Sequence, residues 1–207
     1  MMRTMRRYRY VFPFLFILLA LTLGGWGWLA FSHFQELTPR GSTPERVTPT
    51  AEVHLEKKLR AGTRLVIPAI HVNAPVEAVG ITADGTMDVP RQQPWDGVGW
   101  YTYGTYPGEI GSAVMDGHLD RPGGRPAVFW RLRNLHTGDA VLLVDDEGKT
   151  LRFRVTDIEI YTPQNAPRRT IFGKRSGSFL NLITCVGTWI PSLQQTTQRL
   201  VVYTTMV

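Results

Sequence analysis

Cysteine is nearly absent from this sequence of 207 residues, which contains only Cys185. A single cysteine excludes an intramolecular disulfide, so disulfides do not hold the fold together. The chain is long enough to bury a real hydrophobic core, and it has room for one anchor and one domain of ordinary size. Two full domains would be crowded.

Net charge is also scarce once the first ten residues are set aside. The formal charge is +6, but Arg3, Arg6, Arg7 and Arg9 stand together at the start with no acidic residue among them. Removing these four charges leaves +2 for the rest of the chain. A basic surface for nucleic acid needs charge on the folded domain, so this composition argues against a nucleic-acid partner.

The segment 11–31 carries no charge and is rich in Leu, Phe, Ile and Trp. A helix of this length, at about 1.5 Å per residue, matches the ~30 Å hydrocarbon core of a bilayer. The arginines before the segment predict a cytoplasmic N-terminus, and Trp26 and Trp28 suit the outer interface. We therefore predict a basic cytoplasmic arm at 1–10, a transmembrane signal anchor at 11–31 and an extracellular remainder. A cleaved signal peptide is the alternative, although the segment is long and lacks an A-x-A-like site.

The next segment, 32–62, has the composition of an extracellular linker. Between residues 35 and 50 it contains Pro39, Pro44 and Pro49 among threonine, serine and charged residues. Such a sequence has too few apolar residues to fold alone, and its prolines keep it extended. Leu55 and Leu59, one helical turn apart, predict a short helix at 51–60.

From residue 63 to residue 207 the pattern is that of a mostly β domain. Short apolar runs separated by Gly, Pro and Asp predict about eight strands, and the absence of repeats and long helices favours a closed β-barrel over a sandwich. Turn residues at 84–85 and 145–148 predict hairpins. The apolar alternation slips near Thr156 and Asp157, which predicts a β-bulge. The predicted strands are 64–68, 76–81, 86–89, 112–118, 140–144, 151–161, 179–185 and 200–205.

The lone cysteine is a candidate nucleophile. Cys185 follows an apolar strand and precedes Gly187, and a strand end at a glycine-containing loop is a position from which a side chain can face a cleft. A free thiol outside the cytoplasm is exposed to oxidation, so the cysteine is expected to be either buried or used. On its own, Cys185 fits either reading, because free cysteine often packs as a small apolar residue.

Two other residues stand at strand ends where they could assist a thiolate. His118 follows the small-residue strand that ends in Asp116 and Gly117, and Arg199 opens the last apolar run. Histidine can move protons near neutral pH, and arginine has fixed donors that can stabilise an oxyanion. Taken singly, His118 is more often structural and Arg199 is more often a solvated charge.

Read with their neighbours, these residues resemble the sortase family of cysteine transpeptidases. The family's T-L-x-T-C signature is met by Leu182, Thr184 and Cys185, with Asn181 at the first threonine's place, and its histidine and arginine correspond to His118 and Arg199. The resemblance covers about residues 64–205. The segments at 65–70, 98–101 and 117–120 also contribute, and the last two are most like class E/F sortases.

The resemblance implies an activity. A sortase-like enzyme recognises an LPxTG-like sorting motif, attacks the bond after its threonine through Cys185, forms a thioester, and passes the acyl group to an amine of a peptidoglycan precursor or another protein. It implies that His118 moves the protons, that Arg199 stabilises the attacked carbonyl, and that Thr184 and Leu182 belong to the substrate site. The chemistry needs no cofactor, and without a dense carboxylate cluster we predict no metal.

Two alternatives remain open from the sequence. The first is another extracellular cysteine enzyme, of the L,D-transpeptidase or papain-like class, although the motifs that surround those cysteines are missing here. The second is a non-enzymatic β-domain at the cell surface, anchored in the membrane, in which Cys185 is buried.

Overall fold

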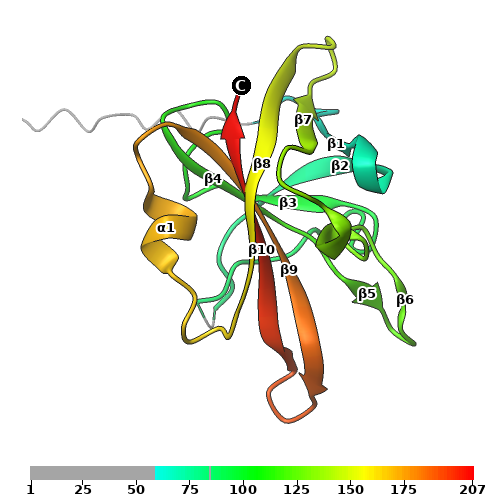
Figure 1. Ribbon diagram of the computed structural model, residues 1–207. Helices are drawn as coiled ribbons and strands as arrows, with labels where there is room; N and C mark the ends of the chain where they lie inside the picture. Colours follow the sequence, from blue (N-terminus) through cyan, green and yellow to red (C-terminus); the bar gives the residue numbers. More distant parts are fainter. Residues whose placement is uncertain (1–58, 84) are drawn as a thin grey trace, which may run out of the picture. The chain divides into compact units, whose positions relative to one another are not determined.

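A computed structural model describes residues 59–83 and 85–207 (Figure 1). The predicted arm, membrane anchor and most of the linker lie outside the described residues, so these assignments stay predictions. Within the described part of the chain, no helix has both the length and the apolar character needed to cross a membrane. The predicted helix at 51–60 also falls outside, apart from Leu59 and Arg60, which have no regular structure.

Eight strands close into a barrel in the order β1-β2-β3-β4-β9-β10-β8-β7. This confirms the predicted closed barrel and excludes the sandwich. Two further short strands, β5 (Asp120–Arg121) and β6 (Arg125–Pro126), pair in a small separate sheet. The barrel strands are β1 (Arg64–Ile67), β2 (Val72–Val79), β3 (Val98–Tyr101), β4 (Gly111–Asp116), β7 (Ala140–Val144), β8 (Thr150–Tyr161), β9 (Ser178–Ile190) and β10 (Gln195–Met206).

Side chains along each strand alternate between the two faces of the barrel, and the inward-facing ones fill its interior. On β4 these are Ala113 and Met115, and on β9 they are Leu180 and Leu182, all without exposed surface. Phe129 enters the same core from the connection between β4 and β7. Successive side chains of a strand point to opposite faces, so the residues between these positions are directed to the outside of the barrel.

Two predicted local features are confirmed. The turn between β7 and β8 is closed by the Asp145 amide, which donates to the Lys149 carbonyl over 3.0 Å, and Gly148 has a φ of 81°, which favours glycine. In the β8–β10 pairing, Tyr203 lies opposite Asp157 while Thr204 lies opposite Val155. Thr156 is therefore the extra residue of a β-bulge, where the sequence alternation slips.

The predicted strand at 86–89 is wrong. Met87 makes only an isolated bridge to Ile81, and the eighth barrel strand is β3 instead. β3 was not predicted because it is short and contains Gly99, so it carries little local strand pattern. Its partner on one side is the parallel strand β2, a pairing that depends on tertiary contacts.

Short helices also form where the strand pattern predicted none. The α-helix α1 (Arg168–Gly173) packs against β4 and buries Ile171. The 3-10 turns η1 (Pro68–Ile70) and η2 (Leu132–Asn134) bury Ile70 and Leu132. Each is too short for helical periodicity to be visible in the sequence.

The central feature for function is the parallel pairing of β4 with β9. Parallel strands end at the same edge of a sheet, so the residues that follow β4 lie beside the middle of the long strand β9. Figure 1 shows β9 and β10 continuing past this edge as a long hairpin. The candidate residues gather at this edge.

Candidate functional site

The backbone ladder brings His118 alongside Cys185. Asp116 is paired with Ile183, and one step further the Gly117 amide donates to the Ile183 carbonyl over 3.2 Å. The Thr184 hydroxyl donates to the Gly117 carbonyl over 2.7 Å. Continuing the same parallel register by one residue sets His118 next to Cys185.

Arg199 completes the row from the other side. It is the direct antiparallel partner of Cys185 on β10, and Tyr161 of β8 is its next neighbour. Val186 and Leu200, the residues that follow Cys185 and Arg199 on their strands, point into the core. Because successive side chains of a strand point to opposite faces, Cys185 and Arg199 point outward. The three residues His118, Cys185 and Arg199 are called the triad row below.

Cys185 is partly exposed, which fits a thiol that must reach a substrate. It does not belong to the group of side chains that fill the barrel core. The expectation that a non-enzymatic domain would bury Cys185 is therefore not met.

His118 is held from two sides. Its ring centroid lies 4.9 Å from that of Trp95 at an interplanar angle of 43°, and its carbonyl accepts from the Phe129 amide over 3.0 Å. Burial lowers the pKa of His118, while the carboxylate of Asp120 acts in the opposite direction. Since the ordinary histidine pKa is about 6.5, the imidazole is mainly neutral at pH 7 and able to accept a proton.

The Arg199 guanidinium is fixed at the base of the β9–β10 hairpin. Its Nη1 donates to the Thr196 carbonyl over 3.1 Å, to the Thr196 hydroxyl over 3.0 Å and to the Gln198 carbonyl over 2.9 Å. Its Nη2 lies 3.4 Å from the Gln195 side-chain oxygen. Held in this way, a planar cation with several donors is fixed on the strand residue that pairs with Cys185.

The structure directs Leu182 and Thr184 away from the outward face. Leu182 is fully buried in the barrel core, and Thr184 is 2% exposed with its hydroxyl bonded to Gly117. These side chains therefore pack inside the barrel and support the site. The sequence had instead predicted that they contact the substrate. Asn181, the departure from the commonest motif, donates to the Ile171 carbonyl over 2.6 Å and ties β9 to α1.

Two contributors were not found from the sequence. Trp95 lies just outside the segment 98–101 and was not singled out in the sequence, and the fold brings it to His118. Gly117 was noted only as a neighbour of His118, yet a Cβ there would lie 2.7 Å from side-chain atoms of both Val128 and Phe129. The close approach of this connection to β4 thus requires glycine.

An apolar surface adjoins the triad row on the outside of the barrel. Val114, Ile171 and Val201 form its buried centre. Around them lie partly exposed apolar side chains, including Ile183, which precedes Cys185 by two residues on the same strand. This cluster, called the apolar strip below, lies where α1 packs against the outside of the barrel. Its other partly exposed members are Met87, Tyr101, Tyr161, Ala166, Phe172 and Tyr203.

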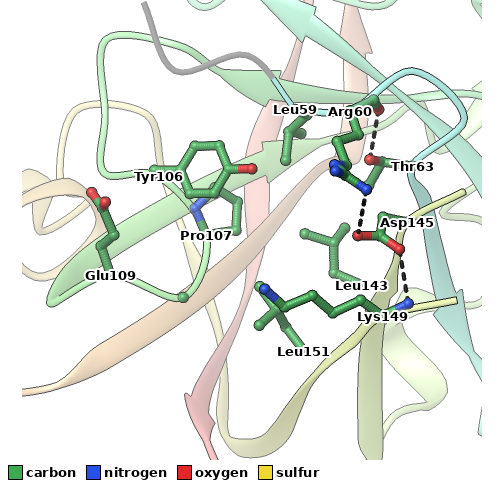
Figure 2. A pocket seen from close by; sticks show the side chains of 11 residues that line it. Leu59, Arg60, Thr63, Tyr106, Pro107, Glu109, Leu143, Asp145, Lys149 and Leu151 are labelled. Atoms are coloured by element: carbon green, nitrogen blue, oxygen red, sulfur yellow. Dashed lines mark hydrogen bonds and ion pairs between the residues drawn. The ribbon is translucent and has the colours of Figure 1, made fainter. Parts of the chain in front are cut away.

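A separate pocket of about 260 Å³ lies at the β7–β8 turn (Figure 2). Its floor contains Leu143 and Leu151, and Arg60 forms ion pairs there with Asp145 and with Glu147. No member of the triad row lines it. The pocket is therefore distinct from the candidate site.

For a metal, the described ranges offer no group of three or more His, Cys, Asp or Glu side chains arranged to hold an ion.

The comparisons with known proteins agree in family. A family model described as "Sortase domain" matches residues 65–207. Sortase C-1 from Actinomyces oris is similar in structure, with 26% identity, a TM-score of 0.54, and coverage of 70% of this chain and 71% of that one. No curated protein gives a sequence match.

Two further solved structures share the fold at lower identity. A lid mutant of sortase A from Corynebacterium diphtheriae is 18% identical, with a TM-score of 0.56 and coverage of 73% of this chain and 72% of that one. The pilus-related sortase C of Group B Streptococcus is 19% identical, with a TM-score of 0.56 and coverage of 73% and 70%.

Proposed function

Because this chain belongs to the sortase family, and is a cysteine transpeptidase by that membership, we propose that its triad row cleaves a sorting peptide and transfers it to an amine. Cys185 is the nucleophile, His118 moves the protons, and Arg199 stabilises the attacked carbonyl. The observation that carries this proposal is the strand register. Cys185 is paired directly with Arg199, and the β4–β9 register, continued beyond the pair Asp116 and Ile183, sets His118 beside Cys185.

In the first half of the reaction, the Cys185 sulfur attacks the carbonyl carbon of the peptide bond after the motif's threonine. The thiol proton passes to the neutral imidazole of His118, and negative charge develops on the carbonyl oxygen near Arg199. The carbon–nitrogen bond then breaks. His118 gives its proton to the departing amine, and the acyl group remains on sulfur as a thioester.

In the second half, an acceptor amine attacks the thioester carbon. His118 takes a proton from the attacking nitrogen, a new amide bond forms, and the Cys185 sulfur leaves and regains a proton. Water in place of the amine would give hydrolysis of the same thioester. The balance between transfer and hydrolysis then depends on which nucleophile reaches the site.

For substrate and acceptor, the family implies proteins with an LPxTG-like sorting signal and an amine of a peptidoglycan precursor or another protein. Assignment to class E/F is part of the proposal, and it is supported by the segments Val98-Gly99-Trp100-Tyr101 and Gly117-His118-Leu119-Asp120. The alternative of a non-enzymatic surface domain is not favoured, since the chain is a sortase and its thiol is partly exposed.

The location is a further part of the proposal. We infer a single-pass membrane protein whose N-terminus is cytoplasmic and whose catalytic domain is extracellular, attached to lipid through the anchor at 11–31. The basic arm and the uncharged segment support this arrangement. Protease added outside intact cells should digest the domain, whereas digestion only after lysis would contradict the orientation.

The activity is tested with residues 51–207 as purified protein, the full chain in detergent serving as a second preparation. Incubation with an LPxTG peptide and an amine such as triglycine should give both cleavage and a peptide–amine product. Cys185→Ala should abolish both while the melting temperature stays close to that of the parent. Full activity in Cys185→Ala would overturn the assignment of the nucleophile.

A further inference from the structure

The last residue of β4, Asp116, lies beside the triad row but has no part in the reaction described above. It precedes His118 by two residues on the same outward face of the chain, and it pairs across the sheet with Gly99 and Ile183. The neighbouring row therefore runs Gly99, Asp116, Ile183, Val201. Asp116 and Cys185 are diagonal neighbours on adjacent strands.

One oxygen of this carboxyl is left without a partner. Asp116 Oδ1 is buried and forms no hydrogen bond within the described part of the chain. A buried polar atom without a partner costs free energy, so such atoms in native proteins call for an explanation. The room for the carboxyl is made by Gly99, because a Cβ at that position would collide with Oδ1 and with the Val79 side chain.

The surroundings keep this carboxyl protonated. Burial raises the pKa of Asp116 to about 8, and the carboxylate of Asp88 acts in the same direction. Glu77, across Gly99 in the same row, accepts from the backbone amides of Arg91 and Gln92. Asp88 is itself paired with Arg91 over 2.7 Å, so the group that favours an incoming hydrogen-bond donor is the buried Asp116 oxygen that has no partner.

The position of Asp116 relative to the apolar strip points to a substrate side chain. Val114 and Ile183 flank it along β4 and across to β9, and Val201 lies beyond Ile183. A peptide whose carbonyl lies at Cys185 and whose preceding residues follow this strip passes the Asp116 carboxyl, whose Oδ1 has no partner. A polar group of this kind among apolar side chains selects among substrate side chains, because an apolar partner would leave it unsatisfied.

We propose that Asp116 is a specificity-determining residue whose carboxyl binds a side chain bearing N–H donors, on the acyl side of the bond that Cys185 attacks. The subsite takes a lysine or an amide side chain, in contrast to an apolar one of equal length. This inference rests on the proposed function, since it assumes that the peptide lies along the apolar strip.

The experiment uses a panel of LPxTG-like peptides in which each position before the scissile bond carries methionine, glutamine or lysine in turn. These three side chains have similar length and differ in their donors. At one position, the parent enzyme should prefer glutamine or lysine over methionine by about tenfold or more in kcat/KM. Equal kcat/KM for the three side chains at every position would overturn the subsite.

Two substitutions of Asp116 by residues of similar size test whether its carboxyl causes the preference. Asp116→Leu should remove the preference or turn it toward methionine. Asp116→Asn should keep a preference for glutamine and lose any advantage of lysine, because it retains a carbonyl but cannot become an anion. Glu159→Gln, at the far end of the same row on β8, is the matched control and should leave all ratios unchanged. Unchanged ratios in both Asp116 variants would overturn the proposal.

Binding separates this subsite from the proposed function. The same peptides are titrated against Cys185→Ala with and without Asp116→Leu, which requires no catalysis. Discrimination in binding without any cleavage by the parent would support the subsite and contradict the proposed function. Cleavage by the parent without discrimination in binding or rate would contradict the subsite alone.

Discussion

Cys185 and Arg199 are direct cross-strand partners on β9 and β10, on the outward face of the barrel. The two residues belong to the arms of one hairpin, so their relative position is fixed by backbone pairing. The guanidinium is further held by Thr196 and Gln198 at the base of that hairpin. The position of the guanidinium relative to the β9–β10 backbone is therefore rigid.

Arg199→Lys should lower kcat by about 100-fold or more, the usual cost of losing one donor to a developing oxyanion. A lysine ammonium is a single point charge, and it cannot hold the hairpin carbonyls and face the substrate in the same planar geometry. The measurement is kcat for peptide cleavage, with the melting temperature as a check on folding. Arg152→Lys, on the exposed side of β8, should leave kcat unchanged. An undiminished kcat in Arg199→Lys would contradict the role given to the guanidinium.

Thr184→Val should lose both stability and activity. It removes the hydrogen bond to the Gly117 carbonyl, which is buried next to His118, at an expected cost of about 1–3 kcal/mol in the free energy of unfolding. Thr204→Val is a matched control, since its hydroxyl makes the same kind of buried bond to the Leu180 carbonyl. Urea unfolding should show similar losses in both variants. Only Thr184→Val should also lower kcat, and an equal kcat in the two variants would argue against its bracing of His118.

Gly117→Ala should destabilise the domain by about 1–3 kcal/mol, because the added methyl group would overlap Val128 and Phe129. If Val128 or Phe129 moves to make room, the backbone at Phe129 moves with it, and the Phe129 amide donates to the His118 carbonyl. We therefore expect a lower melting temperature together with a lower kcat. Gly173→Ala, where a Cβ meets no atom within 4 Å, is the control and should change neither. A melting temperature equal to that of the parent in Gly117→Ala would contradict the close packing.

Asp120→Asn should lower the pKa of His118 still further. Burial already lowers that pKa, and the Asp120 carboxylate is the group that raises it, so removing the charge leaves burial unopposed. The imidazole pKa can be followed by NMR titration of its ring protons. Asp146→Asn, in the β7–β8 turn, should leave the titration unchanged. A His118 pKa that rises in Asp120→Asn would show that the electrostatic account is wrong.

Asp116→Asn should change how stability depends on pH. The folded-state pKa of Asp116 is about 8, against about 3.9 for an unfolded aspartate, so between these values the folded protein holds a proton that the unfolded chain releases. The contribution of Asp116 to stability is therefore complete below about pH 4, falls as pH rises to about 8, and is constant above. Urea unfolding at several pH values should show Asp116→Asn gaining on the parent across this window. A difference that does not vary with pH would contradict the shift.

The sequence was most informative about single elements and about residue types. The alternation in β8 predicted both the strand and the bulge at Thr156, because side-chain burial repeats every two residues along one chain. The turn at 145–148 was visible because its aspartates and glycine favour turn geometry. The family resemblance selected His118, Cys185 and Arg199, and the short separation of Cys185 and Arg199 suits adjacent antiparallel strands, but no local pattern in the sequence could show that His118 lies beside Cys185.

Tertiary structure decided everything that depends on pairing between distant segments. The parallel register of β4 with β9 sets His118 at Cys185, and the choice of β3 over residues 86–89 as the eighth strand lets Gly99 accommodate Asp116. It also decided which face each residue occupies, and so turned Leu182 and Thr184 inward. By itself, the sequence determined the chemistry that the chain carries. Strand register determined which of those groups are neighbours, because pairing energies between distant strands leave no periodic signal in a single chain.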